Sequence, residues 1–237
     1  MDLLARRRAF GLSDEVPDVT VIMPACAWPE PADMTGEPHP QLLAALDSVV
    51  AATKTPTRVE LLVGIDGIAT KVIDAVWEWR NKNTSVETRI FPFEKLPYKT
   101  FGNYQRNRLL DLRMATGRCI SWQDQDDRYC PGALDAVVAL AQKHPASPLI
   151  FRMRMLYTYP PRLLWQDRGR IQIEHIGGHM LVTPNEEELL ARWEPETHYA
   201  ADWSFISNTL HRFADAGRQP VWSETFISNL RPHVLEE

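Results

Sequence analysis

The sequence predicts an α/β protein, a single domain over residues 1–237 with a mostly parallel central sheet flanked by helices. Up to about residue 145, short β-rich apolar runs alternate with helical patterns, as in a parallel sheet covered by crossover helices. No internal repeat, low-complexity stretch or linker interrupts the 237 residues, so one domain is expected. Hydrophobic residues make up 44% and charged residues 24%, which excludes disordered and collagen-like classes.

The first half of the sequence contains four predicted strands, each an apolar run that ends at a turn or polar segment. Their expected ranges are 19–23, 59–65, 86–91 and 118–122. Four helices alternate with these strands, and in the first two the apolar residues recur every three to four positions. Their expected ranges are 42–50, 71–81, 103–116 and 131–143. Gly117 suits the position just after the third helix, and Pro131 suits the first position of the fourth.

The second half of the sequence is less regular. We expect strands over 149–156 and 179–183, and helices over 186–193 and about 202–216. A turn is expected at Gly177-Gly178, just before the second of these strands. His175 and His179 flank this glycine pair, in a region expected to face an acceptor, and are interpreted as loop residues.

Charge and cysteine content narrow the function classes. Basic residues number 26 and acidic residues 31, and the resulting net charge of −5 argues against a nucleic-acid partner. Arg6, Arg7 and Arg8 are interpreted as part of a solvated, flexible N-terminus. The three cysteines lack CxxC spacing, so neither a disulfide framework nor a zinc site is expected. No apolar run reaches the ~18 residues of a membrane span. We expect a cytoplasmic protein, with peripheral membrane contact left open.

Three aspartates, Asp124, Asp126 and Asp127, directly follow the strand expected over 118–122. In an extended segment alternate side chains point the same way, so Asp124 and Asp126 would share one face. Two carboxylates at this spacing suit a hard divalent cation such as Mg²⁺, which completes its shell with water and substrate phosphate. Spacing alone supports an ordinary acidic turn equally well.

A longer pattern surrounds these aspartates. The segments GNYQRNR (102–108), ATGRCISWQDQDD (115–127) and PGAL (131–134) follow the order and spacing of the pattern G…ARN.G…A.G.YI.FLDxDD…PG.L. The segments VTVIMP (19–24), ALDSV (45–49), VELLVGIDG (59–67) and ADW (201–203) match V-S-V-I-I-P, L-x-S-V/I, E-I-I-V-V-D-D-G-S and E-D-W. In these motifs the sequence resembles the inverting glycosyltransferases of family 2, which have the Rossmann-like GT-A fold.

The sequence departs from the family pattern at three places. The family's P-x-Y-N is Pro24-Ala25-Cys26-Ala27, the first Asp and the Ser of D-D-G-S are Ile65 and Ile68, and the Glu of E-D-W is Ala201. The first two places border the nucleotide base in the family. The resemblance therefore leaves the base open, with UDP as the commonest donor nucleotide of the family.

The resemblance implies a function as well as a fold. Residues 18–145 would form the nucleotide-sugar-binding half, and residues 146–237 the acceptor side and C-terminal tail. The protein would move a sugar from a nucleotide-diphosphate sugar, most often a UDP-sugar, to an acceptor hydroxyl, with inversion at the anomeric carbon. Mn²⁺ or Mg²⁺ would neutralise the charge that develops on the departing diphosphate.

The resemblance also assigns roles to individual residues. Asp126 would bind the metal, Asp124 would lie near the ribose or share the metal, and His233 is a candidate third ligand. Asp202 would be the general base that removes the proton of the acceptor hydroxyl. On residue type alone, Asp202 could equally be a helix N-cap. Trp203 is expected either to line the acceptor site or to pack the last long helix.

Four further residues are implied on the donor side. Pro24, Ala25 and Asp66 would contact the nucleotide, although an Asp-Gly pair is also an ordinary turn. Arg106 would neutralise phosphate, and its alternative is a helix-surface charge paired with Asp111 or another acid.

Two other functions compete with the glycosyltransferase interpretation. A sugar-phosphate nucleotidyltransferase would need a Gly-rich basic loop after the first strand, and residues 24–28 do not provide one. A catalytically inactive nucleotide-sugar-binding module stays open because Ala201 replaces a Glu and the segment around Asp66 is altered.

Overall fold

Four parallel strands form the first half of a large sheet. The computed structural model describes residues 2–28, 36–54, 56–96, 98–156, 158, 162–164, 171–173, 175–194 and 199–232. The parallel strands lie in the order β5-β4-β1-β6, and their bounds are β1 (Val19–Ala25), β4 (Val59–Asp66), β5 (Val86–Phe93) and β6 (Cys119–Trp122). The strand order reverses between β1 and β6, which makes that point the switch where open α/β sheets bind ligands.

The second half of the chain extends the same sheet, in the order β6-β10-β8-β11-β7, with β9 paired to β8. The added strands are β7 (Arg128–Tyr129), β8 (Leu149–Met155), β9 (Arg162–Leu164), β10 (Leu181–Pro184) and β11 (Val221–Leu230). β10 is antiparallel to both β6 and β8, whereas β8 and β11 are parallel. Two short strands, β2 (Ala27–Trp28) and β3 (Glu37–Pro38), pair separately.

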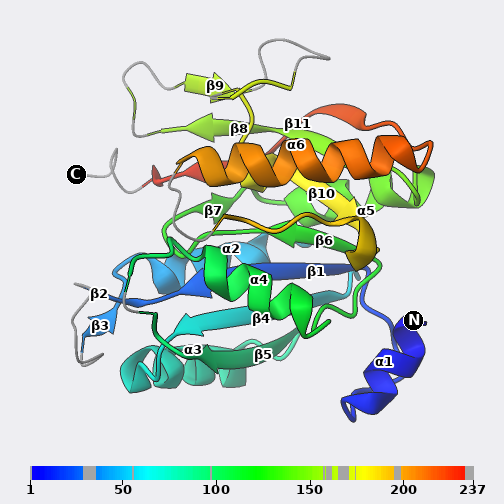
Figure 1. Cartoon of the computed structure of the whole chain (residues 1–237). Coiled ribbons are helices and arrows are strands. Elements are labelled where there is room, and N and C mark those ends of the chain that lie inside the picture. The colour runs from blue at the N-terminus through cyan, green and yellow to red at the C-terminus, as the bar shows by residue number, and fades with distance from the viewer. Residues whose placement is uncertain are drawn as a thin grey trace.

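Helices cover both faces of the sheet (Figure 1). One face carries α2 (Leu42–Ala51), α3 (Thr70–Lys82) and α5 (Ala133–Lys143), whereas the other carries α4 (Asn103–Asp111) and α6 (Tyr199–Asp215). β1 contributes to both cores, because Val21 and Met23 pack on the first face and Ile22 on the second, as the two-residue period of a strand requires. In the described part of the chain, no helix is both long and apolar enough to cross a membrane.

Most predicted elements are present, with shifted ends. The helix expected over 103–116 ends at Asp111, because Arg113 adopts a left-handed φ of 52°. The helix expected from Pro131 begins at Ala133, after Gly132 with a φ of 75°. The helix expected over 186–193 is wrong, because only a 3-10 turn, η2 (Glu187–Leu189), forms there. A side chain of this turn contacts a distant part of the chain instead: Glu187 forms an ion pair with Arg6 at 2.8 Å.

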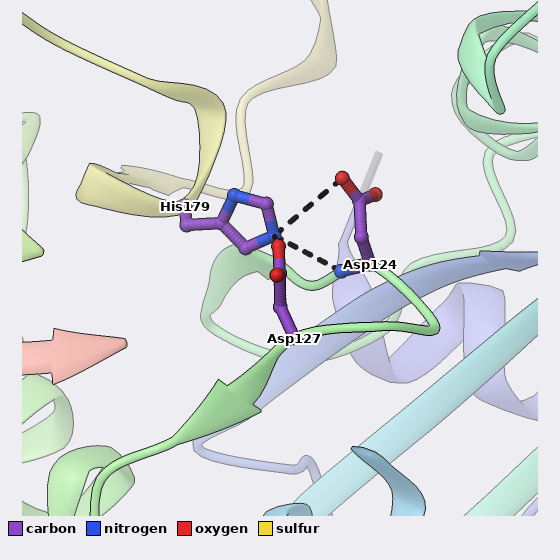
Figure 2. Close-up of side chains that lie close together, drawn as sticks. All are labelled: Asp124, Asp127 and His179. Atoms are coloured by element: carbon purple, nitrogen blue, oxygen red, sulfur yellow. Dashed lines mark hydrogen bonds and ion pairs between the residues drawn. The ribbon is translucent and has the colours of Figure 1, made fainter. Parts of the chain in front are cut away.

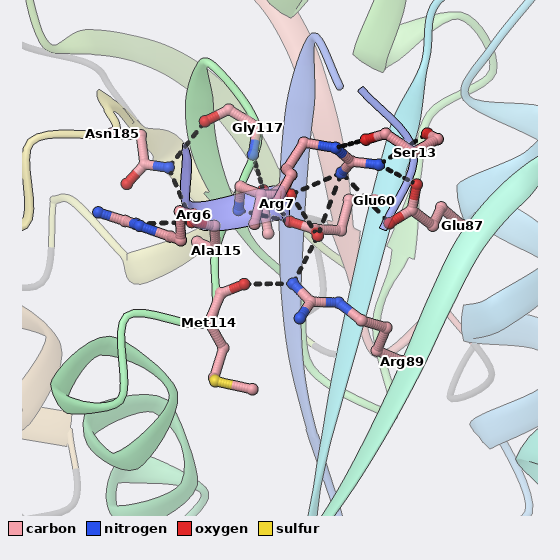
Figure 3. A network of polar contacts seen from close by, with 12 residues as sticks. Arg6, Arg7, Ser13, Glu60, Glu87, Arg89, Met114, Ala115, Gly117 and Asn185 are labelled. Carbon is pink, nitrogen blue, oxygen red and sulfur yellow. Dashed lines mark hydrogen bonds and ion pairs between the residues drawn. The ribbon is translucent and has the colours of Figure 1, made fainter. Parts of the chain in front are cut away.

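The expectation of a solvated, flexible N-terminus is also wrong for two of its three arginines. The N-terminal residues form α1 (Leu3–Ala9), in which Arg6 and Arg7 are buried. Arg7 pairs with Glu87 at 2.7 Å, and Arg6 donates to the carbonyl of Ala115 at 2.8 Å (Figure 3). Glu60, fully buried on β4, lies 4.0 Å from the Arg7 guanidinium. A buried carboxylate needs such cationic and hydrogen-bonding partners, so this network holds α1 against the sheet.

Candidate active site

The candidate site lies where β1, β4 and β6 end, at the switch point of the sheet. The residues between β6 and β7, 123–127, form a loop that carries the three aspartates and is called the acidic loop below. The backbone N–H of Gln123 donates to the carbonyl of Ile22 at 3.1 Å, and Cys26 N–H donates to Gln125 Oε1 at 2.9 Å. These bonds tie the acidic loop to the end of β1.

The residues predicted to contact the nucleotide line the same edge. Ala25 and Ile65 are direct partners on β1 and β4, which places Asp66 one residue beyond this pair. Asp66 Oδ1 accepts a hydrogen bond from Gln105 Nε2 at 2.9 Å, so it also contacts α4. Pro24 packs against Gly102, the N-cap of α4, where any Cβ would lie 2.6 Å from Pro24 Cγ. This close contact sets the start of α4 beside β1.

Arg106, one turn into α4, points from that helix to the acidic loop. Its guanidinium forms an ion pair with Asp124, and it also donates to Asn103 Oδ1 at 3.2 Å. The residue is 4% exposed, and its guanidinium lies 5.3 Å from the centre of the Trp193 ring. Arg106 is therefore not on the helix surface; it does pair with an acid, Asp124, whereas Asp111 pairs with Arg192.

His179 brings two of the aspartates together. Its Nε2 lies 3.0 Å from Asp127 Oδ2 and 3.7 Å from Asp124 Oδ2, and the backbone N–H of Asp124 points to it at 3.0 Å (Figure 2). Residues 125–126 form a turn rather than an extended segment, so the pair that converges is Asp124 with Asp127. Asp126 lies beside this pair, with Arg231 Nε 3.3 Å from its Oδ2.

Charges around the loop change the proton affinity of its members. Burial of the His179 imidazole opposes its charged form, but the carboxylates of Asp124, Asp127 and Asp202 outweigh burial and raise the pKa of His179 to about 9. Burial, together with the Asp127 and Asp124 carboxylates, raises the pKa of Asp126 to about 6 against the opposing effects of Arg231 and His179. The carboxylates of the acidic loop therefore favour the binding of protons at this site.

The donor set around His179 fits a divalent cation. One oxygen of Asp124, one oxygen of Asp127 and one imidazole nitrogen of His179 all lie within 4.8 Å of one another. A nitrogen lone pair and carboxylate oxygens that face each other repel unless a proton or a cation lies between them. Carboxylates suit Mg²⁺ and Mn²⁺, and imidazole is more readily accepted by the transition metal.

Asp202 lies in the first turn of α6, and both of its carboxylate oxygens accept hydrogen bonds. Oδ2 accepts the backbone N–H of Gly178 at 3.0 Å, and Oδ1 accepts the indole N–H of Trp193 at 3.1 Å. These donors come from outside α6, so the carboxylate reaches across to other elements, which an N-cap would not do. A Cβ on Gly178 would lie 3.1 Å from Asp202 Oδ1, so any larger residue would require the carboxylate to shift.

Two consecutive residues, Gly178 and His179, connect Asp202 to the acidic loop. Gly178 binds Asp202 through its backbone, and His179 approaches the acidic loop through its side chain. Both belong to the 3-10 turn η1 (Gly178–Met180), which leads into β10 beside β6. One short turn therefore contacts both Asp202 and the acidic loop.

Four residues stand apart from the sequence prediction. His233 lies outside the described residues. Trp203 is half-buried and packs against the core around α6. Sequence reasoning assigned no role to Arg231, which no motif marks, and it treated His179 as a loop residue. The Gly177-Gly178 pair was the available signal for His179, because small residues permit close approach of the backbone to another group.

The sequence matches no family model, and no curated protein matches it. Solved structures do match. A structure of Staphylococcus aureus TarS residues 1–349 aligns with a TM-score of 0.62 and 16% identity, covering 92% of this chain and 62% of that one. The same fragment in complex with UDP-GlcNAc aligns with a TM-score of 0.61 and 16% identity, covering 90% and 58%.

A mannosyltransferase from Pyrobaculum calidifontis, in complex with GDP-Man and Mn²⁺, aligns with a TM-score of 0.58 and 16% identity, covering 90% of this chain and 56% of that one. The chain thus spans less than two thirds of the length of these structures, and 36% of the longest TarS chain. At this identity the likeness concerns the fold, and the fold shared by this chain is the GT-A fold of glycosyltransferases.

Proposed function

We propose that this protein is a metal-dependent inverting glycosyltransferase that moves a sugar from a nucleotide-diphosphate sugar to an acceptor hydroxyl. The observation that carries the proposal is the meeting of Asp202 with the acidic loop, through Gly178 and His179, at the switch point of a GT-A sheet. A general base and a cation-binding cluster are the two groups that metal-dependent inverting transfer brings together in one site.

Asp202 is well placed to act as the base. Its oxygens accept one hydrogen bond each, from Gly178 and Trp193, and a carboxylate has about four acceptor positions, so lone pairs remain for a substrate proton. The acceptor oxygen attacks the anomeric carbon as its proton passes to Asp202, and the bond from that carbon to the diphosphate oxygen breaks. Attack opposite the leaving group inverts the configuration.

The donor side follows from the same edge of the sheet. Pro24, Ala25 and Asp66 would contact the nucleotide, and Arg106 would carry positive charge toward the diphosphate. Asp124 and Asp126 would hold Mn²⁺ or Mg²⁺, with His179 and Asp127 as ligands that the sequence prediction omitted. The metal would neutralise the charge of the leaving diphosphate.

A UDP-sugar is the proposed donor. The matched structures bind UDP-GlcNAc in one case and GDP-Man with Mn²⁺ in the other, so both bases belong in the test. We expect one nucleoside diphosphate among UDP, GDP and dTDP to raise the thermal midpoint in the presence of Mn²⁺, because ligands that bind only the native state stabilise it. Equal shifts for all three, or none, would contradict donor specificity.

Release of the nucleoside diphosphate from the selected sugar donor then tests catalysis. We expect Asp202→Asn to lower the rate by ~10²–10⁴ while leaving donor binding intact, because the amide cannot accept the proton. Ala201, where the family has Glu, favours a non-catalytic binding module as the second candidate. Donor binding without any turnover by the wild-type protein would support that module instead.

A further inference from the structure

Each aspartate of the acidic loop faces a basic side chain. The pairs are Arg106 with Asp124, His179 with Asp127, and Arg231 with Asp126. The two arginines differ in how firmly they are held. That difference matters because a donor diphosphate brings its own negative charge to the same loop.

Arg106 is held in place. Its side chain is 5% exposed and donates to the carbonyl of Phe101 at 3.3 Å and to Asn103 at 3.2 Å, and its guanidinium lies over the ring of Trp193. Moving it would break several contacts in a buried environment. Arg106 is therefore a fixed charge of the site.

Arg231 combines a fixed backbone with an accessible side chain. Its φ of 45° is left-handed, and its N–H donates to Asp127 Oδ1 at 2.7 Å. Just before it, Ser228 and Asn229 of β11 pair with β7, the strand that directly follows the acidic loop. The side chain, by contrast, is 43% exposed, with Nε 3.3 Å from Asp126 Oδ2. Ion pairs at such exposure are weak and exchange readily.

We propose that Arg231 is an exchangeable counter-ion, which neutralises Asp126 in the empty site and turns to bind the diphosphate of the donor when donor and metal enter. The inference rests on the proposed function. The planar guanidinium of Arg231 offers parallel N–H donors that match phosphate oxygens. Because the Asp127 contact holds the Arg231 backbone, the side chain can change partner without moving the strand.

This role has two consequences of opposite sign. Without the diphosphate, Arg231 competes with a divalent cation for Asp126, so removing its charge strengthens metal binding. With the metal in place, removing the same charge weakens diphosphate binding. A residue that merely supports the loop would weaken both when it is replaced.

The test uses the full chain with Mn²⁺ alone and then with inorganic pyrophosphate, which carries no base or sugar. The variants are Arg231→Gln and Arg231→Asn, the second because asparagine tolerates a left-handed φ, with Arg231→Lys as the charge-retaining control. The affinity for Mn²⁺ is measured from the electron paramagnetic resonance signal of the free ion. The affinity for pyrophosphate is measured by isothermal titration calorimetry at saturating Mn²⁺. We expect the neutral variants to bind Mn²⁺ severalfold tighter and pyrophosphate about tenfold weaker, and the Lys variant to remain near wild type.

Unchanged pyrophosphate affinity in both neutral variants would overturn the inference, as would a joint loss of Mn²⁺ and pyrophosphate affinity. In either case the wild-type protein would still bind Mn²⁺, and the proposed function would stand. A wild-type protein that binds no Mn²⁺ would instead contradict the proposed metal dependence, and this inference with it.

Discussion

Asp202 accepts hydrogen bonds from two different parts of the chain, and these bonds fix the orientation of the proposed base. Trp193 supplies one of the two donors, and its ring stacks on Phe205 at a centroid distance of 3.5 Å. The ring of Trp193 thus contributes to packing, and its N–H orients Asp202. A phenylalanine at this position keeps much of the packing and removes the hydrogen bond.

We expect Trp193→Phe to lower the rate of nucleoside diphosphate release by roughly tenfold while Mn²⁺ affinity stays at the wild-type value, since one hydrogen bond to a charged group is worth about 1.5–3 kcal/mol at most. Trp79→Phe is the matched control. The Trp79 indole also donates to a carboxylate, Asp47 at 2.8 Å, but far from the site between α3 and α2. Equal losses in the two variants would show a general packing effect.

His179 makes the stability of the metal-free protein depend on pH. Its pKa is raised to about 9 in the folded state from an ordinary value of 6.5, so the folded protein binds a proton that the unfolded chain releases. The stabilisation is fully present below pH 6.5 and is lost as the pH rises through 9. The pKa of Asp126, raised to about 6 from 3.8, also makes the free energy of unfolding fall with rising pH, over a lower pH range.

Urea unfolding with a chelator at several pH values between 6 and 9 measures this effect. We expect the free energy of unfolding of the wild-type protein to fall with rising pH in this window, and that of His179→Gln to change much less. The exposed His144 at the end of α5 gives the control variant, His144→Gln. A slope that survives in His179→Gln would assign the proton to another group.

At the scale of elements, the short 3-10 turn η1 contacts both Asp202 and the acidic loop. Its glycine approaches Asp202 and its histidine approaches the acidic loop, and it joins directly to β10. The turn cannot slide along the sheet without breaking the pairing of β10 with β6 and β8. The placement of Gly178 and His179 between Asp202 and the acidic loop therefore depends on strand register.

Gly178→Ala tests this turn. The added Cβ would lie 3.1 Å from Asp202 Oδ1, tighter than ordinary contacts, so the carboxylate must shift. We expect nucleoside diphosphate release to fall at least tenfold, because small displacements of a reacting group are costly. In the companion variant Gly177→Ala, the Cβ meets the flexible end of Met153 at 2.6 Å, and we expect a smaller loss. The reverse ranking would contradict the argument.

The elements that sequence reasoning identified are those whose signal is local. The parallel strands are continuous apolar runs, and the acidic loop follows one of them, so both could be predicted from neighbouring residues. β11 and α1 could not. The pattern of β11 (Val221–Leu230) mixes polar and apolar residues on both faces, and α1 is held by charges on distant strands, Glu60 and Glu87. Such partners are visible only once the sheet has formed.

The same distinction applies to the site. Asp124, Asp126 and Asp202 follow from motifs, whereas the approach of His179 to the acidic loop depends on antiparallel pairing of β10 with β6, some 60 residues apart along the chain. The roles of these residues stay predictions, as does the division into a donor half and an acceptor half within one domain. What the fold adds is that strands of both halves belong to one sheet.

At the scale of the molecule, the candidate metal cluster joins the two predicted halves. Asp124 and Asp127 come from the first half, and His179 comes from the second. A cation bound among them would add a link between segments that also meet where β6 pairs with β10 and where β7 pairs with β11, and would thereby oppose global unfolding. At ~100 times its Kd, a ligand specific to the native state stabilises it by about 2.7 kcal/mol.

We therefore expect saturating Mn²⁺ to raise the thermal midpoint by several degrees and a chelator to reverse the rise. The shift should be larger at pH 8 than at pH 6, because Mn²⁺ and a proton compete for the same imidazole and carboxylates. His179→Gln should lose most of the shift, and His144→Gln should keep it. A shift equal in both variants would place the cation elsewhere on the protein, whereas its loss in His179→Gln alone would assign the cation to the cluster that joins the two halves.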